Sequence, residues 1–258
     1  MAASDILQKL RIAIRPHHEA IHRLNYSRLS LCLPPKVNNL SLYALGLTYY
    51  AELYYGLEEA WVSCIGDPAE WLFEQPDTHI HDSPMSGKER HYALLRPMYV
   101  PELLRTRRLE ADLGLLRSME IGLETSPHEH NMRSEIRSDI IRRITMKPHL
   151  VVAYAWVMYS AILYGGREIS ALLLTAGPGF WGLSATELRS GKMPCPLSFW
   201  HVDDAATVKV RLRTCIEEAD HLLTAQEQQD ILDEAIEIFN MFEMTTTSLD
   251  QQAALMRN

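Results

Sequence analysis

The stretch PHLVVAYAWVMYSAILYGGREIS, from Pro148 to Ser170, is a long apolar run that ends in two glycines. Residues 150–164 are mostly apolar and lead directly into Gly165 and Gly166. Such a run predicts one buried helix, in which each glycine costs roughly 1 kcal/mol relative to alanine. Three roles for the pair offset that cost: a kink, close packing against another helix, or a backbone without Cβ atoms on which a flat molecule can lie.

The composition is that of an ordinary globular protein with an acidic balance. Hydrophobic residues make up 47% of the 258 residues, and 25 Lys and Arg oppose 33 Asp and Glu, for a formal net charge of −8. This charge argues against nucleic acid as a partner. The apolar run is shorter than the roughly 20 residues of a membrane-spanning helix, and the N-terminus lacks the pattern of a secretory signal. We therefore expect a cytoplasmic protein without a membrane span.

Helical periodicity dominates the chain, and strand alternation is hard to find. Helices are predicted at 5–30, 39–64, 88–98, 101–122, 131–146, 148–175, 204–222 and 224–250. The segment 176–203 is rich in Gly, Pro and Ser, and we expect it to be irregular with one short helix near 186–190. Pro16 is expected to kink or restart the first helix. Without repeats or a linker, the pattern predicts one all-α domain over 1–258.

Few sequence motifs with known chemistry are present. The glycine-rich nucleotide-binding patterns, the H-E-x-x-H zinc motif and the G-x-S-x-G hydrolase motif are absent. His18 and His22 are four residues apart on the first predicted helix. This spacing presents two imidazoles to one metal or one imidazole to a cofactor, although paired histidines on a helix surface are also common.

Five segments, in the right order, resemble the heme oxygenase family. They are Leu10–His22, Leu53–Trp61, Pro101–Leu113, His149–Arg167 and Thr224–Phe239. The first resembles the family's proximal helix, and His18 falls on the histidine that ligates heme iron. The fourth resembles the distal helix, where Gly165 and Gly166 match the glycines that let the backbone pack onto the heme face. The resemblance implies the heme oxygenase-like helical fold, heme as a cofactor and a reductase as a partner.

The chain departs from this family on the distal helix. Heme-degrading members carry an aspartate three residues before the first of the paired glycines, where it organises the water network that supplies protons for ring opening. Ile162 stands at that position. An isoleucine side chain has no hydrogen-bonding atom with which to hold water or relay a proton. The resemblance therefore implies an oxidoreductase whose ring opening is impaired.

The positions that bind the heme propionates are only partly kept. The resemblance places Arg11 and Arg211 on two of them, whereas Trp156 replaces a tyrosine and Cys215 replaces an arginine. The glutamate that usually lies four residues after the iron ligand is replaced by His22.

Three functions are compatible with these observations. In the first, His18 binds heme iron in an apolar pocket between the first helix and the glycines of the distal helix. In the second, the fold has lost heme and cyclises or oxidises an apolar small molecule in specialised metabolism, in a pocket shaped by Tyr154, Trp156, Met158 and Tyr159 together with the aromatic residues of the second predicted helix. In the third, the protein is non-catalytic. A di-iron oxidase is disfavoured because residues 150–167 contain no His, Asp or Glu.

Overall fold

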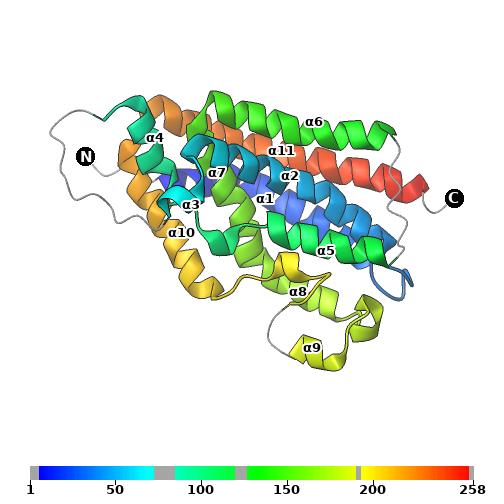
Figure 1. Cartoon of the computed structure of the whole chain (residues 1–258). Coiled ribbons are helices and arrows are strands. Elements are labelled where there is room, and N and C mark those ends of the chain that lie inside the picture. Colours follow the sequence, from blue (N-terminus) through cyan, green and yellow to red (C-terminus); the bar gives the residue numbers. More distant parts are fainter. Residues whose placement is uncertain (1–5, 73–84, 120–126, 190–192, 256–258) are drawn as a thin grey trace.

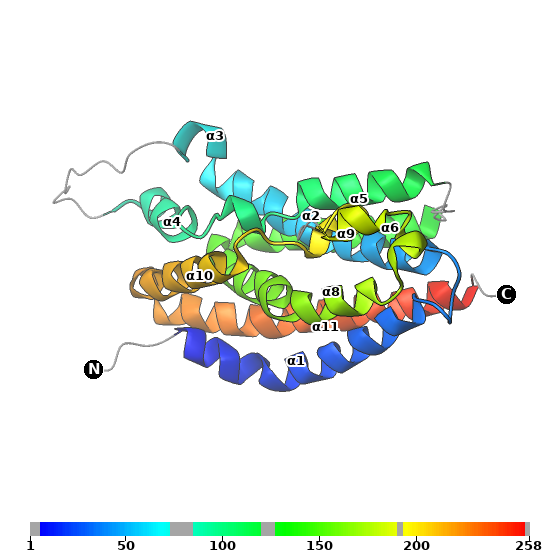
Figure 2. The same cartoon turned by 90° about the horizontal axis from the view of Figure 1, so that it is seen from below.

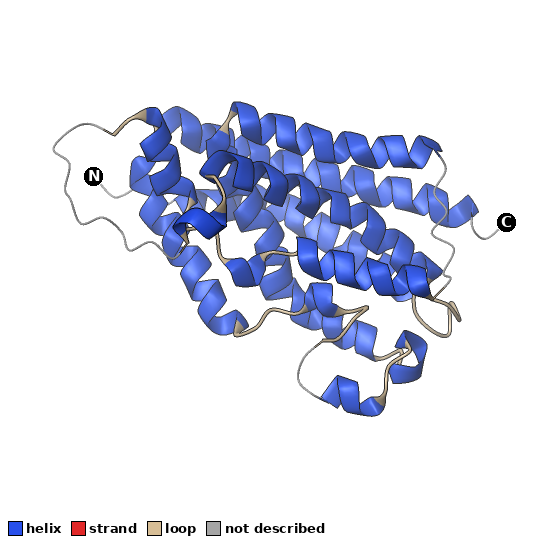
Figure 3. Ribbon diagram, in the orientation of Figure 1, coloured by secondary structure: helices blue, strands red, loops and turns tan. Residues whose placement is uncertain are grey.

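The structure is a computed structural model that describes residues 6–72, 85–119, 127–189 and 193–255. Every regular element in these ranges is helical (Figure 3), which confirms the predicted all-α fold. The α-helices are α1 Ile6–Leu31, α2 Ser41–Ile65, α3 Pro68–Trp71, α4 Gly87–Leu95, α5 Thr106–Ser118, α6 Pro127–Met146, α7 Val151–Tyr154, α8 Gly166–Leu174, α9 Ala185–Arg189, α10 Ala205–Ala219 and α11 Ala225–Leu255. Short 3-10 turns lie at Pro101–Leu103, Pro148–Leu150, Pro178–Trp181, Ser198–Trp200 and Asp220–Leu222.

Four long helices, α1, α2, α6 and α11, form the body of the molecule (Figure 1). α1 and α11 run side by side in the same direction (Figure 2). Hydrogen bonds tie them together near both ends, from Lys9 Nζ to Gln228 Oε1 at 2.8 Å and from Arg28 Nη2 to Asp250 Oδ2 at 2.8 Å. α2 packs on both α6 and α11. The first and last helices, α1 and α11, therefore lie together on one side of the fold.

α1 continues through Pro16 without a break. Pro16 cannot donate a hydrogen bond to the carbonyl of Ile12, but this side of the helix faces solvent, with Ile12 68% exposed. Figure 2 shows α1 curved along its length, with its convex side away from α11. The proline is thus accommodated by curvature, and the predicted restart of the helix at this point is wrong.

The apolar stretch that opens the sequence forms a segmented helix, which we call the distal helix, over residues 148–174. A 3-10 turn and α7 lead into two π-helical turns at Ala155–Tyr159 and Ala161–Gly165, and α8 follows. By length and composition this helix could cross a membrane, but it is mostly buried inside the protein. It is therefore a core helix rather than a span. π-helical turns are rare in proteins, and they frequently occur at functional sites.

The predicted helix 101–122 is divided by Leu104, whose backbone is extended at φ −62° and ψ 133°. The break allows Arg105 to turn inward, where its side chain is fully buried. Its guanidinium donates to the backbone carbonyls of Phe199 at 3.0 Å and His201 at 2.6 Å. The sequence pattern did not predict this break, because an arginine in a helical pattern is expected on the exposed surface of a helix and gives no sign that it is buried.

Two buried carboxylates, together with Arg105, hold the 198–201 segment in place. Glu58 of α2 accepts hydrogen bonds from the backbone amides of Arg105 at 2.6 Å and Thr106 at 3.0 Å. Asp112 of α5 accepts from the backbone amides of Ser198 at 3.1 Å and Phe199 at 2.7 Å. Burial raises the pKa of the Asp112 carboxyl and lowers the pKa of Arg105 to about 10. Since charged groups are costly to bury without partners, this network fixes the segment that carries Phe199 and Trp200.

Candidate functional site

A cavity of about 770 Å³ lies between α1, α2, the distal helix and α11. Most of its wall is apolar, with side chains such as Ile14, Ile21, Leu29, Ile162, Phe239 and Phe242. The anchored residues Phe199 and Trp200 close one part of it. The volume lies within the range of pockets that hold small molecules and cofactors.

Three polar side chains from α1 line this cavity at intervals of seven residues: Arg11, His18 and Asn25. Seven residues make about two turns of an α-helix, roughly 10 Å along its axis, so these side chains share one face. His18 stands in the middle of the row, with a cation on one side and an amide on the other. The sequence predicted the first two, and it missed Asn25.

The imidazole of His18 is exposed to the cavity and is held by its neighbours. It stacks on His22, with ring centroids 6.0 Å apart and an interplanar angle of 9°, and meets Phe239 edge-on at 6.3 Å. His22 also lines the cavity, and its Nε2 lies 3.9 Å from Glu168 Oε2 of α8. The stack therefore places His18 where its ring can bind a ligand.

Among the described residues, no group of three or more His, Cys, Asp or Glu side chains could hold a metal ion. A single imidazole such as His18 is a weak site for a free metal. It is sufficient for an iron whose four equatorial ligands come from a porphyrin. The donor set therefore fits heme better than a bare metal ion.

The two glycines of the distal helix have different surroundings. Gly165 lines the cavity, and a Cβ atom built on it would meet nothing within 4 Å. A Cβ atom on Gly166 would lie 3.6 Å from the backbone carbonyl oxygen of Trp200. Gly166 thus packs against the 198–201 segment, whereas Gly165 leaves open space at the cavity wall. Of the three roles considered above, Gly165 fits the one in which a flat molecule lies on the backbone.

Ile162 and Ser160 also line the cavity from the distal helix. Ile162 is 4% exposed and presents only carbon atoms. The hydroxyl of Ser160 is buried, and it has no hydrogen-bond partner in the part of the chain that the structure describes. Sequence reasoning missed Ser160 because a lone serine in a helix carries no specific signal.

The cations predicted for the propionates lie in different places. Arg11 lines the cavity, with its Cζ 5.5 Å from the ring centroid of Trp156, which lines it as well. Arg211 on α10 does not line the cavity; its Nη1 lies 3.9 Å from Glu102 Oε2. Lys209 of the same helix does not line the cavity either, but its Nζ lies 3.6 Å from the ring centroid of the cavity residue Tyr164.

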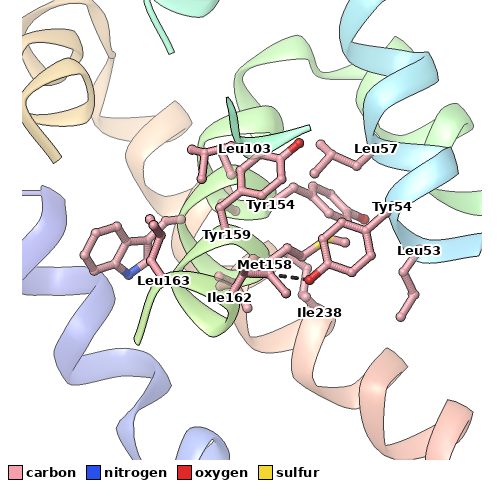
Figure 4. Close-up of a cluster of buried hydrophobic side chains, with 14 of the residues drawn as sticks. Leu53, Tyr54, Leu57, Leu103, Tyr154, Met158, Tyr159, Ile162, Leu163 and Ile238 are labelled. Atoms are coloured by element: carbon pink, nitrogen blue, oxygen red, sulfur yellow. Dashed lines mark hydrogen bonds between the residues drawn. The ribbon is translucent and has the colours of Figure 1, made fainter. Parts of the chain in front are cut away.

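Tyr154, Met158 and Tyr159 belong to the cluster of buried side chains in Figure 4. They are not among the residues that line the cavity. The Tyr154 hydroxyl donates to Glu234 at 2.7 Å, and the Tyr159 hydroxyl donates to Glu58 at 3.1 Å. Burial, together with the nearby Glu58, raises the pKa of Tyr159 well above that of a free phenol. The backbone carbonyl of Met158 accepts a hydrogen bond from Tyr54 at 3.2 Å. These side chains fix the distal helix in place.

A cluster of three polar side chains also lines the cavity, and the sequence did not predict it. Tyr50 of α2 and Thr246 of α11 meet Asn25 of α1 at hydrogen-bonding distances. All three residues line the cavity. No sequence motif links them, because they lie on three helices far apart in the chain.

Comparison with known proteins identifies the family and the fold. The family model for heme oxygenase matches residues 84–247. The fold is similar to that of heme oxygenase from Leptospira interrogans (TM-score 0.64, 19% identity, 95% of this chain and 100% of that chain). It is also similar to heme oxygenase-1 from the cyanobacterium Synechocystis in complex with heme (0.64, 17%, 98% and 97%) and to heme oxygenase 2 from Chlamydomonas reinhardtii without heme (0.68, 13%, 95% and 98%).

At these identities the solved structures show the fold alone. A search of curated proteins gave no match. The family model covers more than half of the chain, and the structural matches extend over nearly all of it. This chain therefore belongs to the heme oxygenase family.

Proposed function

We propose that this protein binds one heme in the cavity between α1 and the distal helix, with His18 as the iron ligand, and that it opens the heme ring poorly. One observation carries the proposal: His18 and Gly165 line the same cavity from two different helices. The first offers an imidazole exposed to the cavity, and the second a backbone with no Cβ atom in the way.

The chemistry of the wall fits this guest. Heme is flat and largely apolar with two carboxylates at one edge, and most of the cavity wall is apolar. Arg11, two turns before His18, supplies a positive charge for one propionate. For the second propionate, Arg15 of α1 also lines the cavity, whereas Lys209 and Arg211 of α10 do not line it and would have to turn their side chains toward it. When bound, heme would supply a redox-active iron.

The residues of the distal helix determine how well such a guest can react. Ile162 excludes water from its part of the wall and cannot hold or move a proton. The hydroxyl of Ser160 lies two residues away in sequence, and it can donate one hydrogen bond but has no acidic proton to give at neutral pH. We therefore propose slow ring opening, with a reductase as electron donor, by a cytoplasmic protein formed of one domain over 1–258.

Ile162 also supports a second candidate function. A heme-independent enzyme that cyclises or oxidises an apolar small molecule in specialised metabolism would use the same mostly apolar wall and would need no proton relay at this position. A non-catalytic heme-binding protein shares features with both candidates. It would bind heme through His18, as in the first proposal, but would not open the heme ring.

Titration with hemin tests the iron ligand. The purified protein should give a sharp Soret band, which His18→Ala should lose. His17→Ala is the matched control, because His17 is the adjacent histidine and does not line the cavity; it should keep the band. A wild-type protein without a Soret band would overturn heme binding and favour the heme-independent enzyme.

Reduction of the hemin complex in air tests the role of Ile162. Little or no bile pigment should form with the wild-type protein, and Ile162→Asp should raise its yield by restoring a carboxylate on the distal helix. Rapid pigment formation by the wild type, at a rate that Ile162→Asp does not increase, would contradict the proposed impairment. No pigment from either protein would favour the non-catalytic heme-binding protein.

A further inference from the structure

We infer that the cavity contains a second binding site, made by Asn25, Tyr50 and Thr246, for a neutral apolar molecule that carries a hydroxyl group. We call these three residues the Asn25 cluster. The inference does not depend on heme binding, because the cluster lies two turns of α1 away from His18, roughly 10 Å along the helix axis.

The Asn25 cluster is a closed triangle of polar atoms from three helices. The Tyr50 hydroxyl lies 3.0 Å from Asn25 Oδ1 and 2.8 Å from Thr246 Oγ1. Thr246 Oγ1 lies 2.9 Å from the same amide oxygen and 2.9 Å from the carbonyl oxygen of Phe242. Each of the three residues lies within hydrogen-bonding distance of the other two. Tyr50 and Thr246 have one hydroxyl hydrogen each, so with the amide oxygen facing them two of these contacts are hydrogen bonds at a time.

The triangle occupies only one end of the Asn25 amide. The two hydroxyls both approach the atom assigned as Oδ1, and Nδ2 has no hydrogen bond to any residue described in the structure. An amide offers an acceptor at one end and two donors at the other, and either end can serve two hydroxyls. Since a hydroxyl group both donates and accepts, it is the guest group that pairs with the remaining end in either orientation.

The surroundings of the Asn25 cluster select a neutral guest. The Tyr50 ring lies 6.0 Å from that of Phe242, centroid to centroid, and both line the cavity. Among the charged residues that line the cavity, Arg28 is the nearest in sequence to Asn25, and its charge is paired because it forms a bidentate hydrogen-bonded pair with Asp250, which also lines the cavity. Burial raises the pKa of Tyr50, which remains an uncharged phenol at neutral pH. An ionic guest would therefore lose its hydration without gaining a partner of opposite charge.

The site differs from the position expected for heme by its place along α1. Arg11, His18 and Asn25 form one row, and Arg11 lies on the far side of His18 from the Asn25 cluster. A heme held by His18 with its propionates toward Arg11 leaves the Asn25 end of the row for another group. The cavity thus has a cationic end and a hydrogen-bonding end whose charged residues, Arg28 and Asp250, are paired with each other.

A pair of probes that differ by one hydroxyl tests the inference: 1-naphthol and naphthalene, titrated into heme-free full-length protein by calorimetry. We expect 1-naphthol to bind about tenfold more tightly than naphthalene, since one hydrogen bond to a buried polar group contributes about this much. Asn25→Leu should remove this difference by weakening 1-naphthol alone. Tyr50→Phe keeps the ring and should also reduce it.

Two controls separate this site from other effects. Asn240→Leu changes an exposed amide of α11 that lies outside the cavity and should leave both probes unaffected. His18→Ala should still prefer 1-naphthol, whether or not the protein binds heme. Equal affinities of the wild type for the two probes, absent binding of both, or a preference that survives both Asn25→Leu and Tyr50→Phe would overturn the inference.

Discussion

Two glycines in the middle of helices show what a missing Cβ atom can do. A Cβ atom on Gly56 of α2 would lie 3.1 Å from both the carbonyl oxygen of Arg137 and the Cβ of Ile140 on α6, so glycine allows the two helices to approach closely. At Gly165 the same atom would enter open space beside the cavity. Packing therefore requires Gly56, whereas no atom of the residues that the structure describes lies where a Cβ atom on Gly165 would be.

Alanine at these two positions should change stability in opposite directions. Gly165→Ala should raise the free energy of unfolding by about 0.5–1 kcal/mol, because alanine is the better helix former and has room. Gly56→Ala should lower it by about 1–3 kcal/mol through overpacking. Urea unfolding of the heme-free proteins measures both. A loss of stability in Gly165→Ala would show that this glycine has a structural role.

The start of α11 shows how one carboxylate can fix a whole element. Thr224 and Glu227 form a reciprocal cap: the Thr224 amide donates to Glu227 Oε2 at 2.9 Å, and the Glu227 amide donates to Thr224 Oγ1 at 3.2 Å. Arg90 of α4 adds two hydrogen bonds to the same carboxylate, at 2.8 and 2.6 Å. Since α11 forms one wall of the cavity, this cap and ion pair also position the site.

Glu227→Gln should destabilise the protein in a pH-dependent way. Hydrogen bonding from Arg90 lowers the pKa of Glu227 to about 2, against an ordinary value of 4.5. A depressed carboxyl pKa gives stability that is present above pH 4.5 and is lost as the pH falls toward 2. We expect a loss of about 2 kcal/mol at pH 7 that shrinks below pH 4.5, measured by urea unfolding across pH.

Glu217→Gln is the control for that experiment. Glu217 pairs with Arg213 at 2.7 Å on the exposed side of α10, and such surface pairs contribute little to stability. Its substitution should leave the unfolding free energy almost unchanged at every pH. A loss in Glu227→Gln that is constant from pH 7 to pH 3 would point to packing rather than charge.

At the level of elements, the sequence predicted most helices because apolar residues recur at helical spacing. It could not predict which side of the distal helix lines the cavity. Residues 150–164 are apolar on every side, so Tyr154 and Tyr159 carry no sign that they face the core. The π turns at 155–159 and 161–165 then change the number of residues per turn, and they shift each later side chain from its expected direction.

The sequence predicted those residues of the candidate site whose side chains have a characteristic chemical role, such as an imidazole that binds iron or a guanidinium that binds a carboxylate. His18 and Arg11 were predicted to form the site, and both line the cavity. Asn25 continues the same spacing, but an asparagine becomes informative only when Tyr50 and Thr246 are seen beside it. Arg211 was placed by the same resemblance as Arg11, but it does not line the cavity, and its Nη1 lies 3.9 Å from Glu102 Oε2.

Over the whole molecule, the cavity joins parts of the chain that are distant in sequence. In sequence order, its walls come from α1 and α2 in the N-terminal part of the chain, from the distal helix in the middle of the chain, and from α11 in the C-terminal part. A guest in contact with all of them can bind only when these helices are assembled. Ligand binding should therefore stabilise the entire fold rather than one local element.

Heme binding should thus raise the temperature of global unfolding. Hemin at about 100 times its dissociation constant stabilises the folded state by about 2.7 kcal/mol. For a chain of this size that corresponds to a rise in Tm of about 5–10 °C. Far-UV circular dichroism follows the transition without interference from heme quenching of tryptophan fluorescence. His17→Ala should keep the rise and His18→Ala should lose most of it. An equal rise in both variants would mean that hemin adheres to the folded protein without using the imidazole of His18.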